Sequence, residues 1–371
     1  MDFIDLKTQQ SRIRDKLTIR FNNILDHGAY IMGPEVNELE EKLSDYTKVK
    51  NVISCSSGTD ALLIPLMAWN VGPGDAVFTT SFTYVATAEV ISLLGATPIF
   101  VDVYESTFNI DCEKLELAIQ KTIASGKLKP KAIIPVDLFG LPARYRVIEQ
   151  IGEKYDLKII EDAAQSFGAT INNKKVGSFG DVSATSFYPA KPLGCYGDGG
   201  AIFTDNDELA DKCKAIRIHG TTNDKYDSEL IGLNGRLDSI QAAVLLEKLK
   251  IFDEELQLRK KISNQYRSIL KNCQYIPKNY TSSYALFSIL FESHQKRNQT
   301  MEQLDKNKIP TVIYYKQPIH LMKAFSYLGY QVGDLPITEN LSQRILSLPM
   351  HPYLSSSDVE LVIKNIQKKN K

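Results

Sequence analysis

The sequence predicts an α/β protein whose central sheet is mostly parallel. Short runs rich in Val and Ile recur over roughly the first 200 residues, and segments with apolar residues at helical spacing lie between most of these runs. Parallel strands buried on both faces are continuously apolar. Regular alternation of such strands with helices is typical of a parallel sheet covered by helices.

The expected elements follow one another along the chain in a simple order. Strands are expected at 51–54, 76–79, 98–101, 132–136, 157–160, 183–187 and 200–204. Helices are expected at 60–69, 85–94, 112–122 and 144–155, and a long helix at about 237–270. The region after about residue 252 has fewer strong strand runs, so we expect the long helix to lead into a second domain.

Composition excludes several classes of partner. The 371 residues contain 44 Lys and Arg against 44 Asp and Glu, a formal net charge of zero, whereas electrostatic binding of nucleic acid needs a basic excess. The longest weakly polar stretch, 91–101, is far shorter than the roughly 20 residues that cross a bilayer. The N-terminus lacks the pattern of a secretory signal. We expect a cytoplasmic protein that binds neither nucleic acid nor membrane.

The five cysteines argue against a metal site or a disulfide framework. They are odd in number and far apart, and they form no C-x-x-C pair and have no neighbouring His at metal-ligand spacing. We therefore expect no structural zinc. The cysteines are Cys55, Cys112, Cys195, Cys213 and Cys273.

Three polar segments stand at the ends of expected strands, where ligands of parallel sheets gather. The first, 56–60, reads Ser-Ser-Gly-Thr-Asp and opens a helix. Free backbone N–H groups and the positive end of the helix dipole suit a phosphate there. Plain N-capping by Ser or Thr is the alternative, and on this segment alone it is the simpler explanation.

The second segment places two acids, Glu161 and Asp162, directly after a buried strand. A carboxylate in that position is costly unless it meets a cation or a protonated ring nitrogen. A helix cap or a metal ligand is an alternative. No His or further acid follows at a suitable spacing, which disfavours the metal.

The third segment holds Lys191 between Pro189 and Pro192, followed by a glycine-rich run at 194–200. A lone lysine is generally a solvated surface residue. A desolvated lysine, however, can lose its proton near neutral pH and form a Schiff base. Lys191, a strand-end Asp and a phosphate-type loop together supply the contacts that pyridoxal 5′-phosphate (PLP) needs.

At these residues the chain resembles a known family, the DegT-type sugar-nucleotide aminotransferases, which are PLP enzymes of the aspartate aminotransferase fold. The resemblance extends from Phe3 nearly to the C-terminus, and the joint order and spacing of the matching blocks are specific. The blocks are 30–36, 57–62, 83–87, 160–169, the Lys191 loop, 234–243 and 347–352. The resemblance implies PLP-dependent transferase fold type I, with a large domain over 1–250 that includes an N-terminal arm over 1–35, and a smaller α+β domain over 251–371.

The resemblance also implies roles around the cofactor ring. Lys191 matches the lysine that binds PLP covalently and then moves a proton as catalytic acid and base. Asp162 matches the acid that pairs with the pyridine nitrogen. Gln165 matches a residue near the phenolic oxygen, and Tyr84 matches the aromatic that stacks on the ring. Filling of the core is the alternative role for Tyr84.

The phosphate contacts implied by the resemblance come from two subunits. Gly58 and Thr59 would donate backbone N–H groups, and Ser186 would donate its hydroxyl. Asn234 matches a residue that completes this cup from the neighbouring subunit. The resemblance therefore implies a homodimer with shared active sites.

The implied reaction moves the amino group of L-glutamate to a nucleotide-linked keto sugar. The chain looks most similar to aminotransferases acting on UDP-2-acetamido-2-deoxy-3-oxo-glucuronate in the synthesis of surface polysaccharides such as lipopolysaccharide. Tyr188 fits this group, and Arg236 would meet the sugar carboxylate or the diphosphate unless it forms an ordinary ion pair. For His320, substrate contact and a structural role are both open.

Two other functions remain as alternatives. Segment 314–325 departs from the pattern expected for uronate-specific members, so a UDP- or dTDP-linked keto-6-deoxyhexose aminated at C3 or C4 is the alternative substrate. A catalytically silent relative that binds a nucleotide sugar is more remote, because the chain holds Lys191, Asp162 and Ser186 together.

Overall fold

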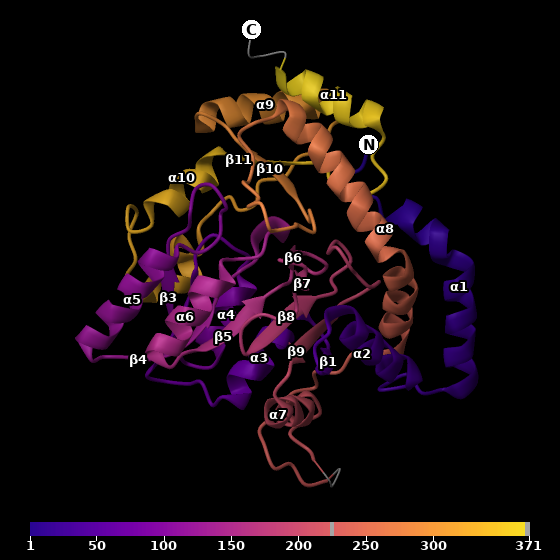
Figure 1. Ribbon diagram of the computed structural model, residues 1–371, viewed down its shortest axis with the longest axis vertical. Helices are drawn as coiled ribbons and strands as arrows, with labels where there is room; N and C mark the ends of the chain where they lie inside the picture. The colour runs from indigo at the N-terminus through magenta and orange to yellow at the C-terminus, as the bar shows by residue number, and fades with distance from the viewer. Residues whose placement is uncertain (223–225, 368–371) are drawn as a thin grey trace.

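A seven-stranded sheet forms the centre of the computed structural model, which describes residues 1–222 and 226–367 (Figure 1). The strand order is β1-β9-β8-β5-β4-β2-β3. Strand β9 runs antiparallel to both of its neighbours, and the other strands are parallel to one another. The strands are β1 (Asn51–Cys55), β2 (Asp75–Thr80), β3 (Thr97–Val101), β4 (Lys129–Ile134), β5 (Lys158–Asp162), β8 (Val182–Ser186) and β9 (Gly200–Thr204). The predicted α/β class with a mostly parallel sheet is confirmed.

The strand boundaries differ most from the prediction at β4. We predicted a strand at 132–136, and the structure has β4 at Lys129–Ile134. Pro135 has no N–H with which to continue the ladder, so the regular strand stops before it. Its carbonyl still accepts from Asp162 N at 3.0 Å, which keeps this stretch beside the end of β5.

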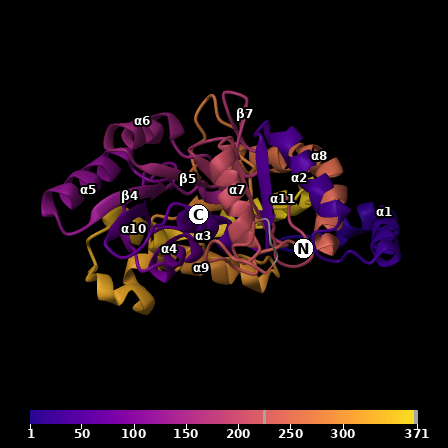
Figure 2. The ribbon, with the colours of Figure 1, turned by 90° about the horizontal axis from the view of Figure 1, so that it is seen from below.

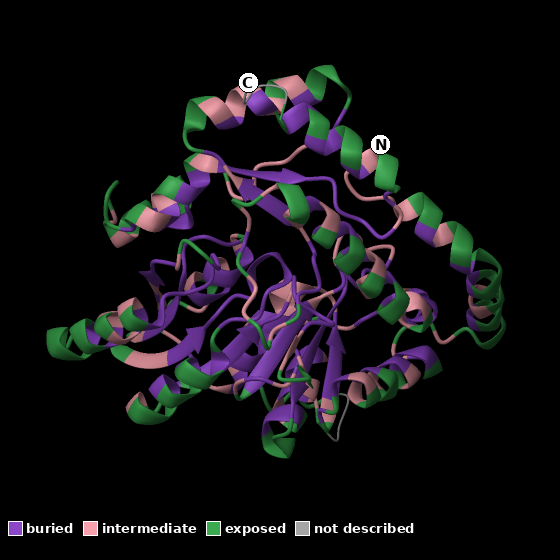
Figure 3. Ribbon diagram, turned by 45° about the horizontal axis from the view of Figure 1, so that its top comes forward, coloured by how far each residue is buried: buried purple, intermediate pink, exposed green. Residues whose placement is uncertain are grey.

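Helices cover both faces of the sheet (Figure 2). Helices α3 (Gly58–Ala68), α4 (Ala86–Leu93) and α7 (Asp207–Arg217) pack on one face, and α5 (Cys112–Ser125) and α6 (Tyr145–Tyr155) pack on the other. These helices have an apolar face at the required spacing; α6, for example, buries Tyr145, Ile148 and Ile151. In Figure 3 the strands are buried and the outer faces of the helices are exposed.

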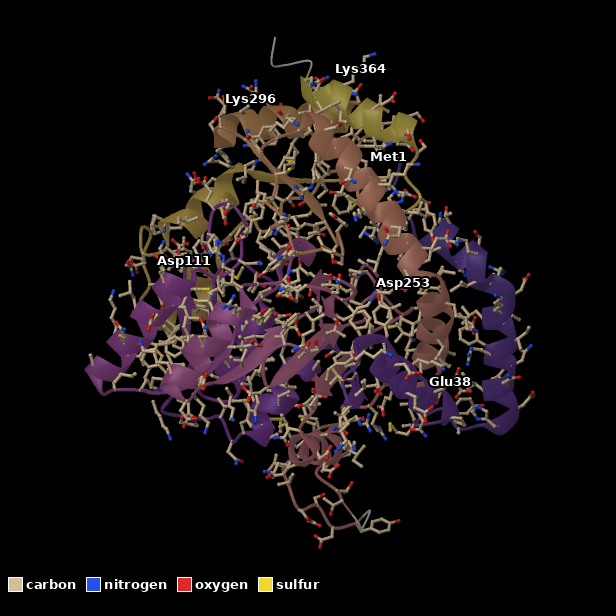
Figure 4. All side chains as sticks on the ribbon, viewed as in Figure 1. Met1, Glu38, Asp111, Asp253, Lys296 and Lys364 are labelled. Atoms are coloured by element: carbon tan, nitrogen blue, oxygen red, sulfur yellow. The ribbon has the colours of Figure 1, made fainter. Side chains whose placement is uncertain are left out.

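The expected N-terminal arm contains a long helix, α1 (Leu6–His27), which the sequence analysis did not predict. It packs on α8 (Ser239–Ile269), and α2 (Pro34–Thr47) packs on α8 as well. Arg20 of α1 forms an ion pair with Glu38 of α2 at 2.9 Å and another with Glu247 of α8 (Glu38 is labelled in Figure 4). The N-terminal segment is therefore fixed to the body of the protein.

The C-terminal region has a core of its own around two short antiparallel strands. These are β10 (Phe287–Leu290) and β11 (Ile345–Leu348), and their four-residue runs are too short to stand out in the sequence. Helix α8 is continuous across residue 250, where we placed the domain boundary. Its Phe252 packs with α2, whereas Ile262 and Tyr266 pack in the C-terminal core.

The other elements are α9 (His294–Lys306), α10 (Pro336–Arg344), α11 (Ser356–Gln367), the β6 (Thr170–Ile171) and β7 (Lys174–Lys175) hairpin, and short 3-10 turns at Leu138–Gly140, Ile319–Leu321 and Lys323–Leu328. Residues 368–371 of the expected small domain lie outside the described residues.

Within residues 1–222 and 226–367, no helix combines the length and the apolar character needed to cross a membrane.

Candidate active site

The three strand ends singled out in the sequence meet at the carboxyl edge of the sheet. Cys55 at the end of β1 and Ser186 at the end of β8 both pair with Gly200, the first residue of β9. Asp162 at the end of β5 pairs with Ala184 of β8. The 56–60 segment, the strand-end acid and the Lys191 loop therefore emerge from neighbouring strands.

The first segment forms a backbone cradle at the start of α3. Ser57 caps the helix by accepting a hydrogen bond from Asp60 N at 3.0 Å, so the capping alternative is correct for this residue. Among the described residues, no acceptor faces the N–H groups of Gly58 and Thr59, because they lie in the first turn of the helix. A Cβ at Gly58 would lie 2.5 Å from Ser186 Cβ, so a side chain at this position would displace the serine. Capping and an anion site therefore coexist here.

Asp162 is a buried carboxylate that lacks a full cationic partner. It is 4% exposed. Its Oδ2 accepts from Thr87 Oγ1 at 2.8 Å and its Oδ1 from Ala164 N at 3.3 Å, and it forms no ion pair within the described chain. Burial raises the pKa of Asp162, and the two hydrogen bonds and the nearby Lys191 oppose that rise. A protonated ring nitrogen would supply the missing positive charge.

Glu161 points away from this site because successive strand residues face opposite sides of a sheet. Its Oε2 accepts from Gly177 N at 2.9 Å and from Phe179 N at 3.3 Å, and burial raises its pKa. The two adjacent acids therefore do not act together. No group of three or more His, Cys, Asp or Glu side chains suited to a metal ion occurs in the described parts of the chain.

Lys191 lies in a tight turn after β8, and its N–H donates to Tyr188 O at 2.8 Å. Within the described residues its Nζ has neither a hydrogen bond nor an ion pair. Burial lowers the pKa of Lys191, while the Asp162 carboxylate acts in the opposite direction. The amine is thus partly desolvated and available for reaction.

Two tyrosines and a glutamine gather beside this pair. Gln165 Oε1 accepts from Phe139 N at 2.9 Å, and its Nε2 donates to Tyr315 OH at 3.1 Å, so the amide is held in one orientation. Tyr84 is 58% exposed and lies close enough to Tyr315 to contribute to the raised pKa of that phenol. This exposure disfavours a core-filling role for Tyr84. Sequence reasoning missed Tyr315, which is 150 positions from Gln165 and carries no local motif.

Thr87 is a second residue that sequence reasoning missed. It belongs to the 83–87 block that we quoted for the resemblance, yet only Tyr84 received a role there. Thr87 lies in the first turn of α4, and its hydroxyl points at Asp162. The proximity of the two chain segments, which are 75 residues apart, could not be read from either segment alone.

Asn234 and Arg236 form a pair on the surface. Arg236 donates to Asn234 Oδ1 from Nε at 2.9 Å and from Nη2 at 2.6 Å. Because the amide oxygen is engaged, the Nδ2–H groups of Asn234 remain as donors, which is the chemistry a phosphate requires. Arg236 has no ion pair with the described residues, so the structural ion-pair alternative is not observed.

Tyr188 and His320 differ in their access to the site. Tyr188 is 54% exposed and lies close enough to Tyr314 to influence its pKa. His320 is 1% exposed, and both ring nitrogens are engaged: Nδ1 with Ser81 Oγ at 2.7 Å and Nε2 with Glu339 Oε1 at 3.2 Å. With both ring nitrogens occupied by these contacts, the structure favours the structural role that we left open for His320, at the end of β2, and substrate contact stays a prediction.

Comparison with known proteins gives matches over the whole chain. A profile of the DegT/DnrJ/EryC1/StrS aminotransferase family matches residues 11–367. A UDP-2-acetamido-2-deoxy-3-oxo-D-glucuronate aminotransferase of Pseudomonas aeruginosa is 44% identical over 366 residues, covering 98% of each chain. A dTDP-3-amino-3,6-dideoxy-alpha-D-galactopyranose transaminase of Aneurinibacillus thermoaerophilus is 37% identical over 367 residues, covering 99% of this chain and 98% of that protein.

Solved structures agree with the family match. The crystal structure of a DegT DnrJ EryC1 StrS aminotransferase from Brucella abortus superposes with a TM-score of 0.96 at 50% identity, covering 100% of this chain and 99% of that one. NtdA of Bacillus subtilis, solved with the cofactor PMP bound, superposes with a TM-score of 0.89 at 30% identity, covering 99% of this chain and 82% of that one. The expected aminotransferase fold is thereby confirmed. With the profile spanning 11–367 and relatives matching from end to end, the chain belongs to the DegT/DnrJ/EryC1/StrS aminotransferase family.

Proposed function

We propose that this enzyme uses PLP to move the amino group of L-glutamate to C3 of UDP-2-acetamido-2-deoxy-3-oxo-glucuronate, and that it works as a homodimer with shared active sites. One observation carries the catalytic part of the proposal. A lysine amine with no hydrogen bond or ion pair to the described residues lies close enough to the buried Asp162 carboxylate to interact with it electrostatically, and a backbone cradle for an anion opens from a neighbouring strand. The sugar rests on the 44% identity to the uronate aminotransferase.

The residues present fit PLP at each of its polar ends. The N–H groups of Gly58 and Thr59 and the Ser186 hydroxyl would hold the phosphate at the positive end of α3. Asp162 would hold the ring nitrogen, and Lys191 would hold the aldehyde carbon. When bound, PLP supplies an electron-accepting ring and a carbon that stores an amino group between the two half-reactions.

Lys191 Nζ is the group that moves the proton. Because burial lowers its pKa, the amine is more readily neutral near physiological pH and can accept the proton from the amino-bearing carbon of glutamate. In the separate half-reaction with the keto sugar, the same amine would donate a proton to C3 of the sugar. Asp162 would favour a protonated ring nitrogen, since a buried carboxylate is stabilised by a positive charge beside it.

The ring is positioned by side chains around this pair. Tyr84 is exposed at the site and offers an aromatic face, and Gln165 is fixed by Phe139 and Tyr315 so that one amide N–H remains free for the phenolic oxygen. The partner subunit's Asn234 would complete the phosphate cup. This sharing accounts for the exposure of Asn234 and for the orientation of its amide.

Arg236 and Tyr188 are the proposed contacts to the sugar nucleotide. The guanidinium of Arg236 has capacity beyond its bonds to Asn234 and suits the carboxylate of a uronate or the diphosphate. The 37% identity to a dTDP-sugar transaminase supports the alternative of a dTDP-linked keto-6-deoxyhexose.

Two experiments test this function in sequence. Protein loaded with PLP should lose its visible absorbance band when glutamate is added, and an unchanged spectrum would refute amino transfer from glutamate. An amino-transfer assay should then compare 3-keto and 4-keto sugars linked to UDP and to dTDP. We expect the highest kcat/KM with the UDP-linked 3-keto uronate; preference for a dTDP-linked sugar would select the alternative.

A further inference from the structure

The backbone of Gly235 joins two parts of the molecule that the proposed function assigns to different active sites. Its N–H donates to Arg217 O at 2.9 Å, and its carbonyl accepts from Ser56 N at 3.0 Å. Ser56 begins the phosphate cradle of its own subunit. Asn234 and Arg236, on either side of Gly235, are assigned to the partner subunit's site.

Arg217 fixes this junction from the end of α7. It is 6% exposed, and its Nη1 donates to Ser54 O at 2.8 Å and to Glu40 Oε1 at 2.7 Å. The same Glu40 oxygen accepts from Ser54 N at 2.9 Å and from Ser54 Oγ at 2.7 Å. The arginine therefore ties α7 to α2 and to the end of β1, two residues before the cradle begins.

Backbone contacts from residues on either side of Arg217 hold the segment that carries Asn234. Leu233 N donates to Ile216 O at 2.8 Å, His219 N donates to Leu233 O at 2.9 Å, and Asn234 bridges to Ile218. In Figure 1 the chain after α7 projects away from the body before it returns to α8. The position of Asn234 thus depends on the end of α7, which Arg217 holds.

We propose that Arg217 is a positioning residue for the partner subunit's active site, acting through Gly235 on Asn234 and Arg236. This inference rests on the proposed shared-site homodimer. It predicts an effect in trans: loss of Arg217 from one subunit weakens PLP binding in the other subunit. An arginine that only stabilises its own subunit would have no such effect.

A heterodimer with one functional site distinguishes an effect of Arg217 on the other subunit's site from an effect confined to its own subunit. One subunit, called active, is wild type. The other, called passive, carries Lys191→Ala, and the two are isolated together by different affinity tags. Borohydride treatment attaches bound PLP irreversibly to Lys191, so the mass of the active subunit reports PLP occupancy at that site alone. Titration with PLP gives the affinity, and amino transfer is measured in the same samples.

We expect Arg217→Gln in the passive subunit to lower the PLP affinity of the active subunit's site by about tenfold, the scale for displacing one hydrogen bond to a charged group. Glu40→Gln in the passive subunit should also lower the PLP affinity of the active subunit's site, with a smaller effect. It replaces Arg217→Gln as the test variant if Arg217→Gln fails to assemble. Arg297→Gln is the matched control, because Arg297 is also buried but lies in α9 with its Nη1 on Ile345 O.

The outcomes distinguish this inference from the function on which it rests. Unchanged PLP affinity with both Arg217→Gln and Glu40→Gln would overturn the positioning role. An equal loss with Arg297→Gln would also overturn it, because it would indicate general destabilisation. Asn234→Ala in the passive subunit tests the shared site itself: if it leaves the active subunit unaffected, the shared-site proposal fails, whatever the result for Arg217.

Discussion

Replacing Thr87 by Val removes the one side-chain hydrogen bond that Asp162 receives from the described residues and leaves the shape of the side chain almost unchanged. The Thr87 hydroxyl donates to Asp162 Oδ2 at 2.8 Å, and Asp162 is buried, with 4% of its surface exposed. This bond favours the ionised carboxylate and so lowers the pKa of Asp162 against the effect of burial. In the variant, that pKa rises further.

The size of the effect follows from the charge on the acceptor. A hydrogen bond to a charged group contributes about 1.5–3 kcal/mol, and about 1.4 kcal/mol corresponds to a tenfold change. We therefore expect Thr87→Val to lower kcat/KM for glutamate about 10- to 100-fold. Because the role proposed for Asp162 at the ring nitrogen requires an ionised carboxylate, the acid limb of the pH–rate profile should move to higher pH.

The assay is the rate of the glutamate half-reaction, followed by visible absorbance between pH 5 and 9 in PLP-loaded protein. Thr87→Ser keeps the donor and should retain most of the activity. Thr79→Val is the matched control, since Thr79 is a buried threonine of β2 whose hydroxyl donates to Ile134 O at 2.8 Å and not to the Asp162 carboxylate. An unchanged acid limb in Thr87→Val, or an equal shift in Thr79→Val, would refute the reasoning.

Three further changes test other parts of the site. Lys191→Ala should abolish amino transfer while circular dichroism and the melting temperature stay close to wild type; residual turnover would contradict its catalytic role. Gly58→Val should reduce PLP affinity at least about 100-fold, because its Cβ would lie 2.5 Å from Ser186 Cβ, and equilibrium titration of PLP checks this. His320→Ala should lower the free energy of unfolding by about 2–4 kcal/mol, as the buried imidazole and its hydrogen bonds to Ser81 and the partly exposed Glu339 are lost, with little change in KM for the sugar nucleotide. A large increase in KM at unchanged stability would restore His320 as a substrate contact.

The regular part of the fold could be predicted because its pattern is local. Each strand of the central sheet has its own apolar run, so errors in the strands are confined to ends such as Pro135. Helices α3, α4, α5 and α6 were predicted from their own spacing, whereas α7, which also covers the sheet, was not. The elements that we missed have weaker local patterns. Helix α1 has mostly exposed residues and is fixed by ion pairs such as Arg20 with Glu38, whereas β10 and β11 have only four residues each.

In the candidate site, too, features with a local sequence pattern could be predicted, and contacts between distant segments could not. Asp162 and the 56–60 segment were recognisable because each follows an apolar run in the sequence, whereas the role expected for Ser186 came from the family resemblance. What sets their chemistry comes from distant segments: Thr87 contacts Asp162 across 75 residues, and Tyr315 contacts Gln165 across 150. For His320 the sequence left substrate contact and a structural role open, and only its distant contacts with Ser81 and Glu339 favour the structural role.

The opposite pKa shifts of Lys191 and Asp162 connect the fold to cofactor binding. Burial disfavours the charged form of each group, so it lowers the pKa of the lysine and raises that of the aspartate. In the proposed function PLP would relieve both costs, because it would react with the neutral amine and present a protonated nitrogen to the carboxylate. The enzyme can therefore favour PLP over another phosphate of similar size without any excess of positive charge, in keeping with its 44 basic and 44 acidic residues. Selectivity of this kind predicts that Asp162→Asn lowers the affinity for PLP more than the affinity for inorganic phosphate at the same cradle. Only PLP has a ring nitrogen that would lose its carboxylate partner in this variant.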